Sequence, residues 1–444
     1  MLSSFSGYGS RLLKKIAIQR NLFVFYAGMI LLTNSSIFSA DWPQWRGPNR
    51  DELSSETGLL SDWSKQSPKL LWTARNLGRG YSNPTIVEGK VYIQGCREDK
   101  SDFLICLDLK TGKELWSVPV QEFYDNGWGG GPRGTPTVSG DHIYLIGPKG
   151  YIGCYKKSNG EKVWGVDLIK TYGGKLMSGW GYSESPLVDG NQVVCCPGGE
   201  KGTVLALNKD TGKLIWQSSK LKDPAAYSSL IPATILGVPQ YVTTTGNSIV
   251  GIDAKSGNLL WKYSKQGTYK VAVIPTVVVK DNYVFATAGY GAGCDLIEIT
   301  GSKSSMQAQK IYANKNMVNH HGGVILYKDH IYGYSDGKGW ICLDLMKGEI
   351  KWSEKTNQKT KGLGKGSITY ADGHFYCYGE SDGTVVLIEA STEGWNQKGR
   401  LELPEKTKLP RKAGQIWTHP TVSNGKLFLR DQDLLFCFDI KNVQ

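Results

Sequence analysis

Short apolar runs separated by polar turns recur along this chain of 444 residues. The clearest example reads Cys106-Leu-Asp-Leu-Lys-Thr-Gly112-Lys-Glu-Leu-Trp116. An apolar strand leads into a turn, and a second strand begins with alternating residues and ends on Trp. The Gly permits the positive φ of a tight turn, and the preceding Thr can hydrogen-bond the turn backbone. The pattern therefore predicts two strands joined by a tight turn.

The pattern returns at intervals of about 45 residues. Further copies end on Trp164, Trp216, Trp261 and Trp352. Upstream of most copies a small residue and Pro precede an apolar run, as in Thr135-Pro136-Thr137, and a turn then leads into another strand. Each interval thus predicts four short strands, the content of one blade of a β-propeller.

The tryptophans and the last interval set the number of blades. The distance from Trp261 to Trp352 is twice the others, so one blade between them has lost its Trp. The last interval stops at its third strand, Leu435–Asp439, and Leu70–Trp72 offers the missing fourth. We therefore predict an all-β fold, a single eight-bladed β-propeller of four-stranded blades over residues 69–444. An N-terminal strand around Leu70–Trp72 completes the last blade and closes the ring.

Residues 41–68, which precede this strand, carry no repeat. We expect an irregular N-terminal arm that crosses one face of the ring before closing it. Its Trp42 and Trp45 have two interpretations: they anchor the arm to the propeller, which we favour, or they form a binding surface.

Residues 1–40 are typical of an export signal. Basic residues precede an apolar core at 21–33 that is too short to span a bilayer comfortably. We expect cleavage after Ala40, with retention as an uncleaved anchor as the alternative. No Cys follows the core, so a lipoprotein is not expected. We predict an exported protein, periplasmic or extracellular, with no membrane span once the signal is removed.

The charge of the chain argues against nucleic acid as a partner. The formal net charge is +12, but part of it lies in the predicted signal. No run of Lys and Arg stands out in the remainder.

Nine cysteines raise the question of disulfides. Four of them share one repeat position: Cys106, Cys154, Cys342 and Cys437. This predicts small buried residues, since free Cys packs as a small hydrophobe and equivalent positions of different blades are too far apart to bridge. The adjacent Cys195 and Cys196 are either bonded in a strained ring or two unbonded strand residues, and we favour the second.

The repeated Asp/Asn-x-x-Thr-Gly-x-x-x-Trp pattern resembles that of the PQQ-repeat β-propellers, which include quinoprotein alcohol dehydrogenases and the outer-membrane assembly propeller. Asp41–Asn49 and Asn319–Gly323 also resemble a branch of exported bacterial propellers of unassigned function. The resemblance implies that tryptophans dock each blade on the next: Trp72, Trp116, Trp164, Trp216, Trp261 and Trp352. In the enzymes it implies pyrroloquinoline quinone (PQQ) held with Ca²⁺ and a catalytic Asp at the top of the channel, and a vicinal Cys ring over the cofactor. We cannot match those residues here one by one, and no Cys-x-x-Cys-His haem motif is present.

The loops that enter the innermost strands should ring the mouth of the channel. Our candidate site residues on these loops are Arg133, Trp180, Glu184, His320, His321, Lys365, Trp417 and His419. Tyr81, Trp128 and Tyr227 occupy similar positions. Three hypotheses stay open: an anionic or sugar-like ligand held by Trp faces and Arg133 or Lys365, a transition metal on His and Glu184, or a hydrated channel without a ligand.

Two functions follow as hypotheses. The first is an exported, non-catalytic propeller of the cell envelope that binds a small molecule or an envelope protein at one face of the ring. The alternative is a PQQ- and calcium-dependent dehydrogenase of alcohols or sugars. Fold alone does not decide between them, because the same repeat serves enzymes and scaffolds.

Overall fold

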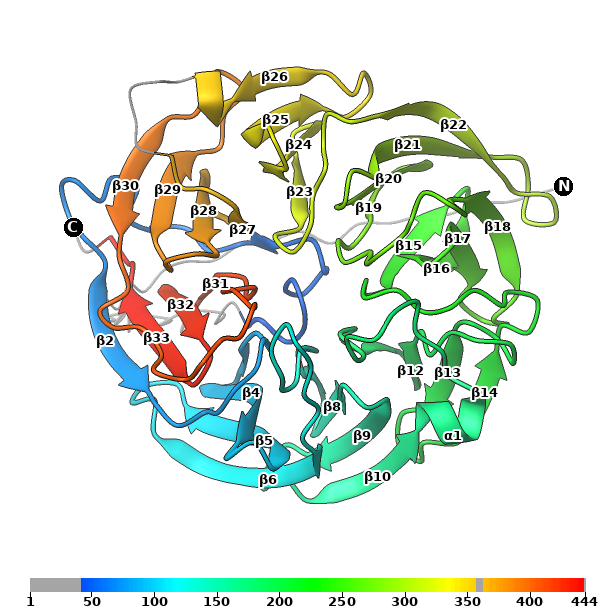
Figure 1. Ribbon diagram of the computed structural model, residues 1–444, viewed down its shortest axis with the longest axis horizontal. Coiled ribbons are helices and arrows are strands. Elements are labelled where there is room, and N and C mark those ends of the chain that lie inside the picture. Colours follow the sequence, from blue (N-terminus) through cyan, green and yellow to red (C-terminus); the bar gives the residue numbers. More distant parts are fainter. Residues whose placement is uncertain (1–40, 357–361, 443–444) are drawn as a thin grey trace, which may run out of the picture. The chain divides into compact units, whose positions relative to one another are not determined.

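The computed structural model describes residues 41–356 and 362–442, so the predicted signal at 1–40 lies outside the described residues. Figure 1 shows eight sheets arranged in a ring. Each sheet has four antiparallel strands, and one of them gains a short fifth strand, β1 (Leu53–Ser54), which pairs in parallel with its innermost strand. The predicted all-β, eight-bladed propeller is confirmed.

We number the blades in chain order and give each from its innermost to its outermost strand. Blades 1 to 4 consist of β3 (Thr85–Val87), β4 (Lys90–Arg97), β5 (Ser101–Asp108) and β6 (Glu114–Glu122); β7 (Thr137–Ser139), β8 (His142–Ile146), β9 (Tyr151–Lys156) and β10 (Lys162–Asp167); β11 (Leu187–Asp189), β12 (Gln192–Cys195), β13 (Leu205–Asn208) and β14 (Leu214–Gln217); and β15 (Ile231–Ile235), β16 (Val238–Thr244), β17 (Ser248–Asp253) and β18 (Leu259–Ser264). Blades 5 to 8 consist of β19 (Val278–Lys280), β20 (Tyr283–Ala288), β21 (Gly293–Thr300) and β22 (Gln307–Asn314); β23 (Val324–Tyr327), β24 (His330–Ser335), β25 (Gly339–Asp344) and β26 (Ile350–Ser353); β27 (Gly366–Ala371), β28 (His374–Gly379), β29 (Val385–Glu389) and β30 (Gln397–Leu401); and β31 (Thr421–Ser423), β32 (Lys426–Asp431), β33 (Leu434–Asp439) and β2 (Lys69–Ala74). Two short helical elements are α1 (Leu168–Tyr172) and η1 (Glu354–Thr356). Within the described residues, no helix combines the length and the apolar character needed to cross a membrane.

The hydrophobic core lies between neighbouring sheets. Middle strands such as β17 are buried along their whole length, because each sheet packs between two others. In outermost strands such as β18 burial varies along the strand: Trp261 is buried, whereas Lys262 and Ser264 are exposed. The burial pattern explains why the inner strands read as continuous apolar runs in the sequence.

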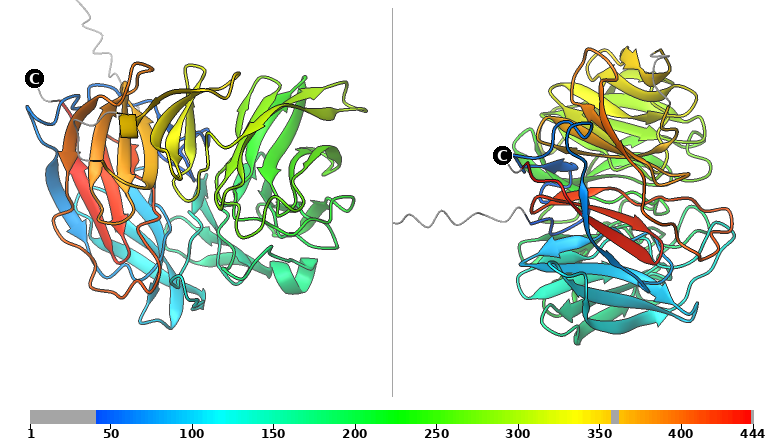
Figure 2. Two further views of the ribbon diagram at one scale, coloured as in Figure 1. Left: turned by 45° about the horizontal axis from the view of Figure 1, so that its top comes forward. Right: turned by 90° about the vertical axis from the view of Figure 1, so that its left-hand side faces the viewer.

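The first strand of the propeller closes the ring. β2 pairs antiparallel with β33, with Trp72 opposite Cys437. The two strands lie side by side in both views of Figure 2. The predicted completion of the last blade by Leu70–Trp72 is therefore confirmed.

Four of the docking tryptophans lie on the turn glycine of the next blade. A Cβ atom on Gly112 would lie 2.5 Å from the indole of Trp72, and one on Gly257 would lie 2.3 Å from that of Trp216. Both glycines also have positive φ, 69° and 72°. The turn and the interblade contact therefore require Gly for separate reasons.

Two blades lack this Trp, and each replaces it differently. In blade 5, Tyr312 packs against Gly348 of blade 6, and its hydroxyl donates to Leu345 O at 2.7 Å. In blade 7 the equivalent position is Gly399, which lies opposite the third strand as the tryptophans do elsewhere. Trp63 of the N-terminal arm fills the space, since a Cβ atom on Gly399 would lie 2.3 Å from it. The arm thus supplies an indole that the blade itself lacks.

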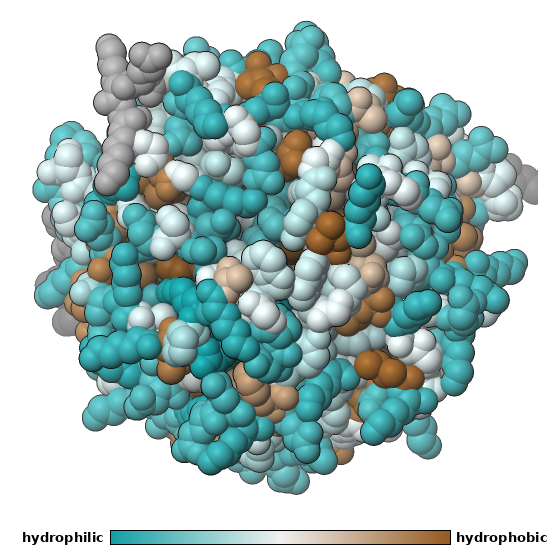
Figure 3. All heavy atoms as spheres, in the orientation of Figure 1, coloured by the Kyte–Doolittle hydropathy of each residue, from teal (hydrophilic) through white to brown (hydrophobic). Residues whose placement is uncertain are grey.

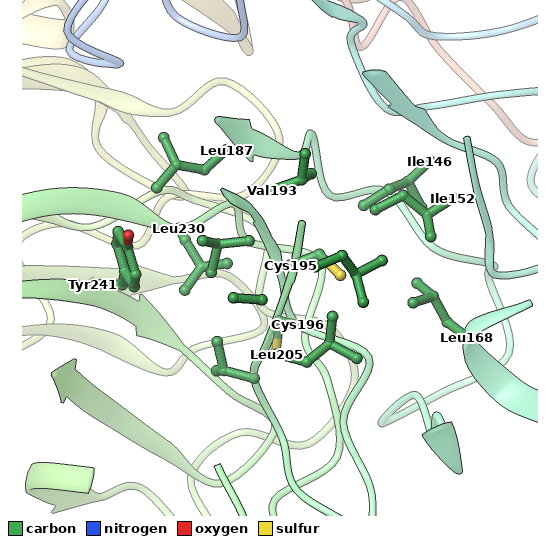
Figure 4. Close-up of a cluster of buried hydrophobic side chains, with 14 of the residues drawn as sticks. Ile146, Ile152, Leu168, Leu187, Val193, Cys195, Cys196, Leu205, Leu230 and Tyr241 are labelled. Atoms are coloured by element: carbon green, nitrogen blue, oxygen red, sulfur yellow. The ribbon is translucent and has the colours of Figure 1, made fainter. Parts of the chain in front are cut away.

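All nine cysteines are buried and unbonded. Cys195 ends β12 and Cys196 follows it, and Figure 4 shows both among apolar side chains that include Leu205 and Leu230. Burial raises the pKa of both thiols well above the ordinary value. The two thiols are unbonded, as we favoured, and pack as small hydrophobes, but only Cys195 lies in a strand.

Candidate functional site

The N-terminal arm, residues 41–68, lies across one end of the channel. It forms hydrogen bonds with seven of the eight blades through the pairs Trp42–Ile86, Pro43–Val138, Arg50–Ser185, Trp45–Thr276, Arg46–Val324, Glu52–Tyr370 and Glu56–Gly425. In the right-hand view of Figure 2 the arm lies at one face of the ring, and the loop between β30 and β31 reaches the other. The arm is therefore a floor to the channel.

Buried charges hold this floor in place. The Nε of Arg46 lies 3.4 Å from Glu52 Oε2, and both side chains are at most 2% exposed. Glu52 also accepts from Thr369 Oγ1 at 3.0 Å and lies 3.3 Å from His419 Nδ1. Arg46, Arg50 and Glu52 all have positive φ, which non-Gly residues keep only where their surroundings over-determine it. Arg46 of the arm therefore has its counter-charge, Glu52, inside the fold.

Above the floor lies a cavity of about 240 Å³, with Trp45 and Arg46 of the arm in its lining. Six of the eight candidate residues line it: Arg133, Trp180, His320, His321, Trp417 and His419. They are joined there by Tyr81, Trp128 and Tyr227. Figure 3 shows the face onto which the β30–β31 loop projects as mostly hydrophilic, with small, separate hydrophobic patches.

Glu184 and Lys365, the other two candidates, do not line the cavity. The buried carboxylate of Glu184 accepts the backbone N–H of Cys196 at 2.7 Å, and burial raises its pKa to about 8. Lys365 Nζ lies 3.2 Å from His320 Nδ1 and 2.7 Å from Asp336 Oδ1. Glu184 thus has a structural role, whereas Lys365 contacts His320, which lines the cavity.

Four aromatic rings follow one another along the cavity lining, with centroid separations of 4.5, 3.8 and 4.2 Å: Tyr290, His320, His321 and Trp417. The first pair meets edge to face, the second is tilted, and only His321 and Trp417 are stacked. Burial, helped by Lys365, lowers the pKa of His320 to about 4, and burial lowers that of His321 well below its ordinary value. Both imidazoles are therefore neutral at pH 7. Because the Lys365 ammonium can only donate, His320 Nδ1 accepts and the ring proton lies on Nε2. That Nε2 is buried and finds no hydrogen-bond partner in the described residues.

Arg133 lines the cavity without a counter-charge. Its Nη2 donates to Gly129 O at 2.8 Å, and its guanidinium lies 4.9 Å from the ring centre of Tyr81. Across residues 41–356 and 362–442 it forms no ion pair within 4.0 Å. Burial lowers its pKa, but the guanidinium stays charged. A cation in an aromatic surround with spare N–H donors attracts an anion.

The donor set of the cavity does not suit Ca²⁺. This ion takes roughly six to eight oxygen ligands, carboxylates prominent among them, and none of the described residues that line the cavity is Asp or Glu. The PQQ–Ca²⁺ arrangement implied by the enzymes therefore does not fit these residues.

The transition-metal hypothesis also lacks a suitable donor set. No cluster of three or more His, Cys, Asp or Glu in the part of the chain that the structure describes could hold a metal ion. Both ring nitrogens of His419 are engaged, Nδ1 by Glu52 and Nε2 by His321 O at 3.0 Å. His419 therefore holds the floor and the wall together.

Three lining residues lie outside the loops that we expected to form the mouth. Trp45 and Arg46 come from the arm: Trp42 is a buried anchor, whereas Trp45 both donates to Thr276 and faces the cavity. Tyr290 lies in the turn between β20 and β21 with φ 53°. An aromatic residue between two glycines, Gly-Tyr-Gly, was the available signal.

These features define a class: an eight-bladed β-propeller whose channel is floored by its own N-terminal arm and holds an aromatic, cationic cavity above that floor. A family model described as outer membrane protein assembly factor BamB matches residues 50–121 and 100–354. The chain therefore belongs to this family of PQQ-repeat propellers.

Its relatives are distant. The chain is 22% identical over 296 residues to outer membrane protein assembly factor BamB of Yersinia pestis, covering 55% of this chain and 71% of that protein. The BamB of Legionella pneumophila is 27% identical over 213 residues, 47% of this chain and 49% of that protein. Among solved structures, a quinohemoprotein alcohol dehydrogenase from Comamonas testosteroni has a TM-score of 0.62 at 10% identity and covers 91% of this chain and 81% of that one. This last likeness shows the fold alone.

Proposed function

We propose that this chain is an exported, non-catalytic binding protein of the cell envelope that holds a small ligand in the cavity. The observation that carries the proposal is a cavity floored by the arm and lined by aromatic rings, in which Arg133 has no counter-charge and His320 Nε2 no partner among the described residues. Buried polar groups normally find partners inside the fold, so unpaired ones beside a cavity favour a ligand. The predicted signal and a family named for outer membrane protein assembly support the envelope location.

The test fills the cavity and asks whether binding is lost. Ser183 lines the cavity, so Ser183→Phe should occupy the space, whereas Ser304→Phe on the exposed β21–β22 turn is the matched control. A thermal-shift screen of neutral sugars, sugar acids, aromatic acids, amines and PQQ should give stabilising compounds for the wild type and Ser304→Phe. These compounds should have no effect on Ser183→Phe. A screen without hits, or hits that persist in Ser183→Phe, would overturn the proposal.

A protein partner at the same face is the second candidate, and the BamB family match favours it. Trp128 lines the cavity and is 49% exposed, so a docked partner would contact it. A photocrosslinking residue in place of Trp128 should give a discrete protein adduct in cells if a partner docks there. An adduct-free result together with ligand binding would assign the face to the small molecule alone.

The dehydrogenase alternative rests on the fold likeness to quinohemoprotein enzymes. Purified protein incubated with PQQ and Ca²⁺ should not reduce a dye with a panel of alcohols and sugars, because the cavity offers no carboxylate ligand. Turnover in this assay would replace the non-catalytic proposal.

A further inference from the structure

The charges around the cavity can neutralise one negative charge. Arg46 is paired with Glu52, and Lys365 with Asp336. Only Arg133 among the lining cations has no carboxylate partner in the described residues. A ligand with several carboxylates or phosphates would carry buried charges that nothing here neutralises, which is costly. The geometry therefore favours a monoanion, and a carboxylate matches the guanidinium fork.

Several hydroxyl groups that line the same cavity can still donate a hydrogen bond to a ligand. Ser185 Oγ accepts the backbone N–H of Thr135 at 2.9 Å, and Ser229 Oγ accepts that of Ser185 at 3.0 Å. Thr276 Oγ1 accepts the indole N–H of Trp45 at 3.1 Å. A hydroxyl that accepts from the protein keeps its own O–H to donate to a ligand. These groups suit a ligand with several hydroxyl oxygens.

The neutral His320 adds an uncharged hydrogen-bond donor, in contrast to the charged Arg133. Its Nε2–H is buried beside the cavity, unpaired, and held in orientation by Lys365 on the other ring nitrogen. A hydroxyl oxygen can accept this proton without adding charge. The wall therefore offers a donor to a neutral acceptor, and Arg133 offers donors to an anion.

The aromatic side chains and the size of the cavity complete the description. Trp128 and Trp180 line it, and the flat apolar face of an indole can pack against the C–H groups of a pyranose ring. The volume of about 240 Å³ lies below the roughly 300–1,000 Å³ of pockets for drug-sized ligands. A single sugar ring fits this description better than a large fused aromatic.

We propose that the ligand is a sugar monocarboxylate of the hexuronate class, with its carboxylate on Arg133 and its hydroxyls on the serine and threonine hydroxyls and on His320. This inference rests on the proposed binding function and deepens it.

Isothermal titration of the full protein at pH 7 tests it with a matched pair of probes, sodium D-glucuronate and D-glucose. Glucuronate should bind roughly ten- to a hundredfold more tightly than glucose, the usual range for a hydrogen bond to a charged group. Arg133→Gln should remove most of that difference, because it should weaken glucuronate binding far more than glucose binding. Arg75→Gln, at the exposed ion pair with Glu405, is the control and should bind both sugars as the wild type does. A thermal melt checks that Arg133→Gln is folded.

The outcomes separate this inference from the binding function. Equal binding of the two sugars, or glucuronate binding unaffected by Arg133→Gln, overturns the assignment of the carboxylate. If neither sugar binds but another compound of the screen binds and is blocked by Ser183→Phe, the uronate inference is wrong and the binding function stands. If nothing in the screen binds, both fall.

Discussion

The two ends of the channel hold arginines in opposite circumstances. At the floor, Arg46 is buried against Glu52, which also contacts His419 and Thr369. At the mouth, Arg133 lies over an aromatic ring, and within the described part of the chain it donates only to backbone carbonyls of its own loop. The charges at the floor are paired within the fold, whereas Arg133 at the mouth has no counter-charge in the described residues.

Whether a charged group has a partner inside the fold distinguishes structural residues from functional ones, whereas residue type alone does not. In the described residues Arg133 has no counter-charge and His320 Nε2 has no partner, so these groups contribute little to folding and are available to a ligand. Compensated groups such as Glu52 contribute to stability, and their loss leaves a partner charge stranded. Mutations at the two ends should therefore separate stability from binding.

The largest expected effect is deletion of residues 41–73, which removes the floor, Trp63 and most of β2. β33 would lose its outer partner, and the site at Gly399 would lose its indole. The truncated protein should aggregate or melt at a distinctly lower temperature, as gel filtration and thermal unfolding would show. Trp63→Ala alone should cost roughly 3–5 kcal/mol, the usual figure for emptying a large aromatic site. A monomeric deletion variant with unchanged melting would contradict the structural role of the arm.

A smaller but still large effect is expected for Glu52→Ala. It leaves the Arg46 guanidinium buried without its counter-charge and removes a contact of His419. Stranding a buried charge costs roughly 3–5 kcal/mol, and urea unfolding would measure the loss. Glu405→Ala, which breaks the exposed pair with Arg75, should change stability by less than about 1 kcal/mol.

The repeat allowed the ring to be predicted, because its Trp, Gly and turn residues are determined by local backbone conformation and by contacts between neighbouring blades. Trp72 and Gly112 need each other at a fixed spacing, so the pattern repeats and the missing strand at Leu70–Trp72 can be inferred from it. Trp63 escaped prediction because it meets Gly399 across a long stretch of chain and follows no repeat. Nothing local marks it as the docking residue of blade 7.

The mouth was predicted in outline and not in detail. Topology places the loops before the innermost strands around the channel, which is why Arg133 and Trp417 were candidates. It does not say which way each side chain turns, and Glu184 turns to the backbone of Cys196 instead. Tyr290 arrives from a different turn altogether. Direction of side chains depends on packing that a single sequence does not display.

Lowering the pH should reduce the stability of the folded protein through His320. Its pKa in the folded chain, about 4, is below the ordinary value of 6.5 because of burial and Lys365. The unfolded chain therefore binds this proton more tightly, so stability is full above pH 6.5 and falls as the pH drops towards 4. The loss attributable to His320 is of the order of 1–3 kcal/mol. His320→Gln should flatten this part of the pH profile of urea unfolding, and His330→Gln, at the start of β24, should not; equal profiles for both variants would contradict the buried, neutral wall.

The smallest expected change in stability belongs to the residue with the largest expected role in binding. Arg133 has no carboxylate partner in residues 41–356 and 362–442 to leave stranded, and the carbonyls of Gly129 and Gly131 that it contacts can bond water in the cavity instead. Arg133→Gln should therefore alter the free energy of unfolding by less than about 1 kcal/mol, and a gain is expected if desolvation of the charge outweighs its two backbone contacts. Urea unfolding at low and high salt would measure this, since an unscreened cation is less costly when salt is added. A loss as large as that of Glu52→Ala would mean that Arg133 is held for the fold, and the contrast between the two ends of the channel would be wrong.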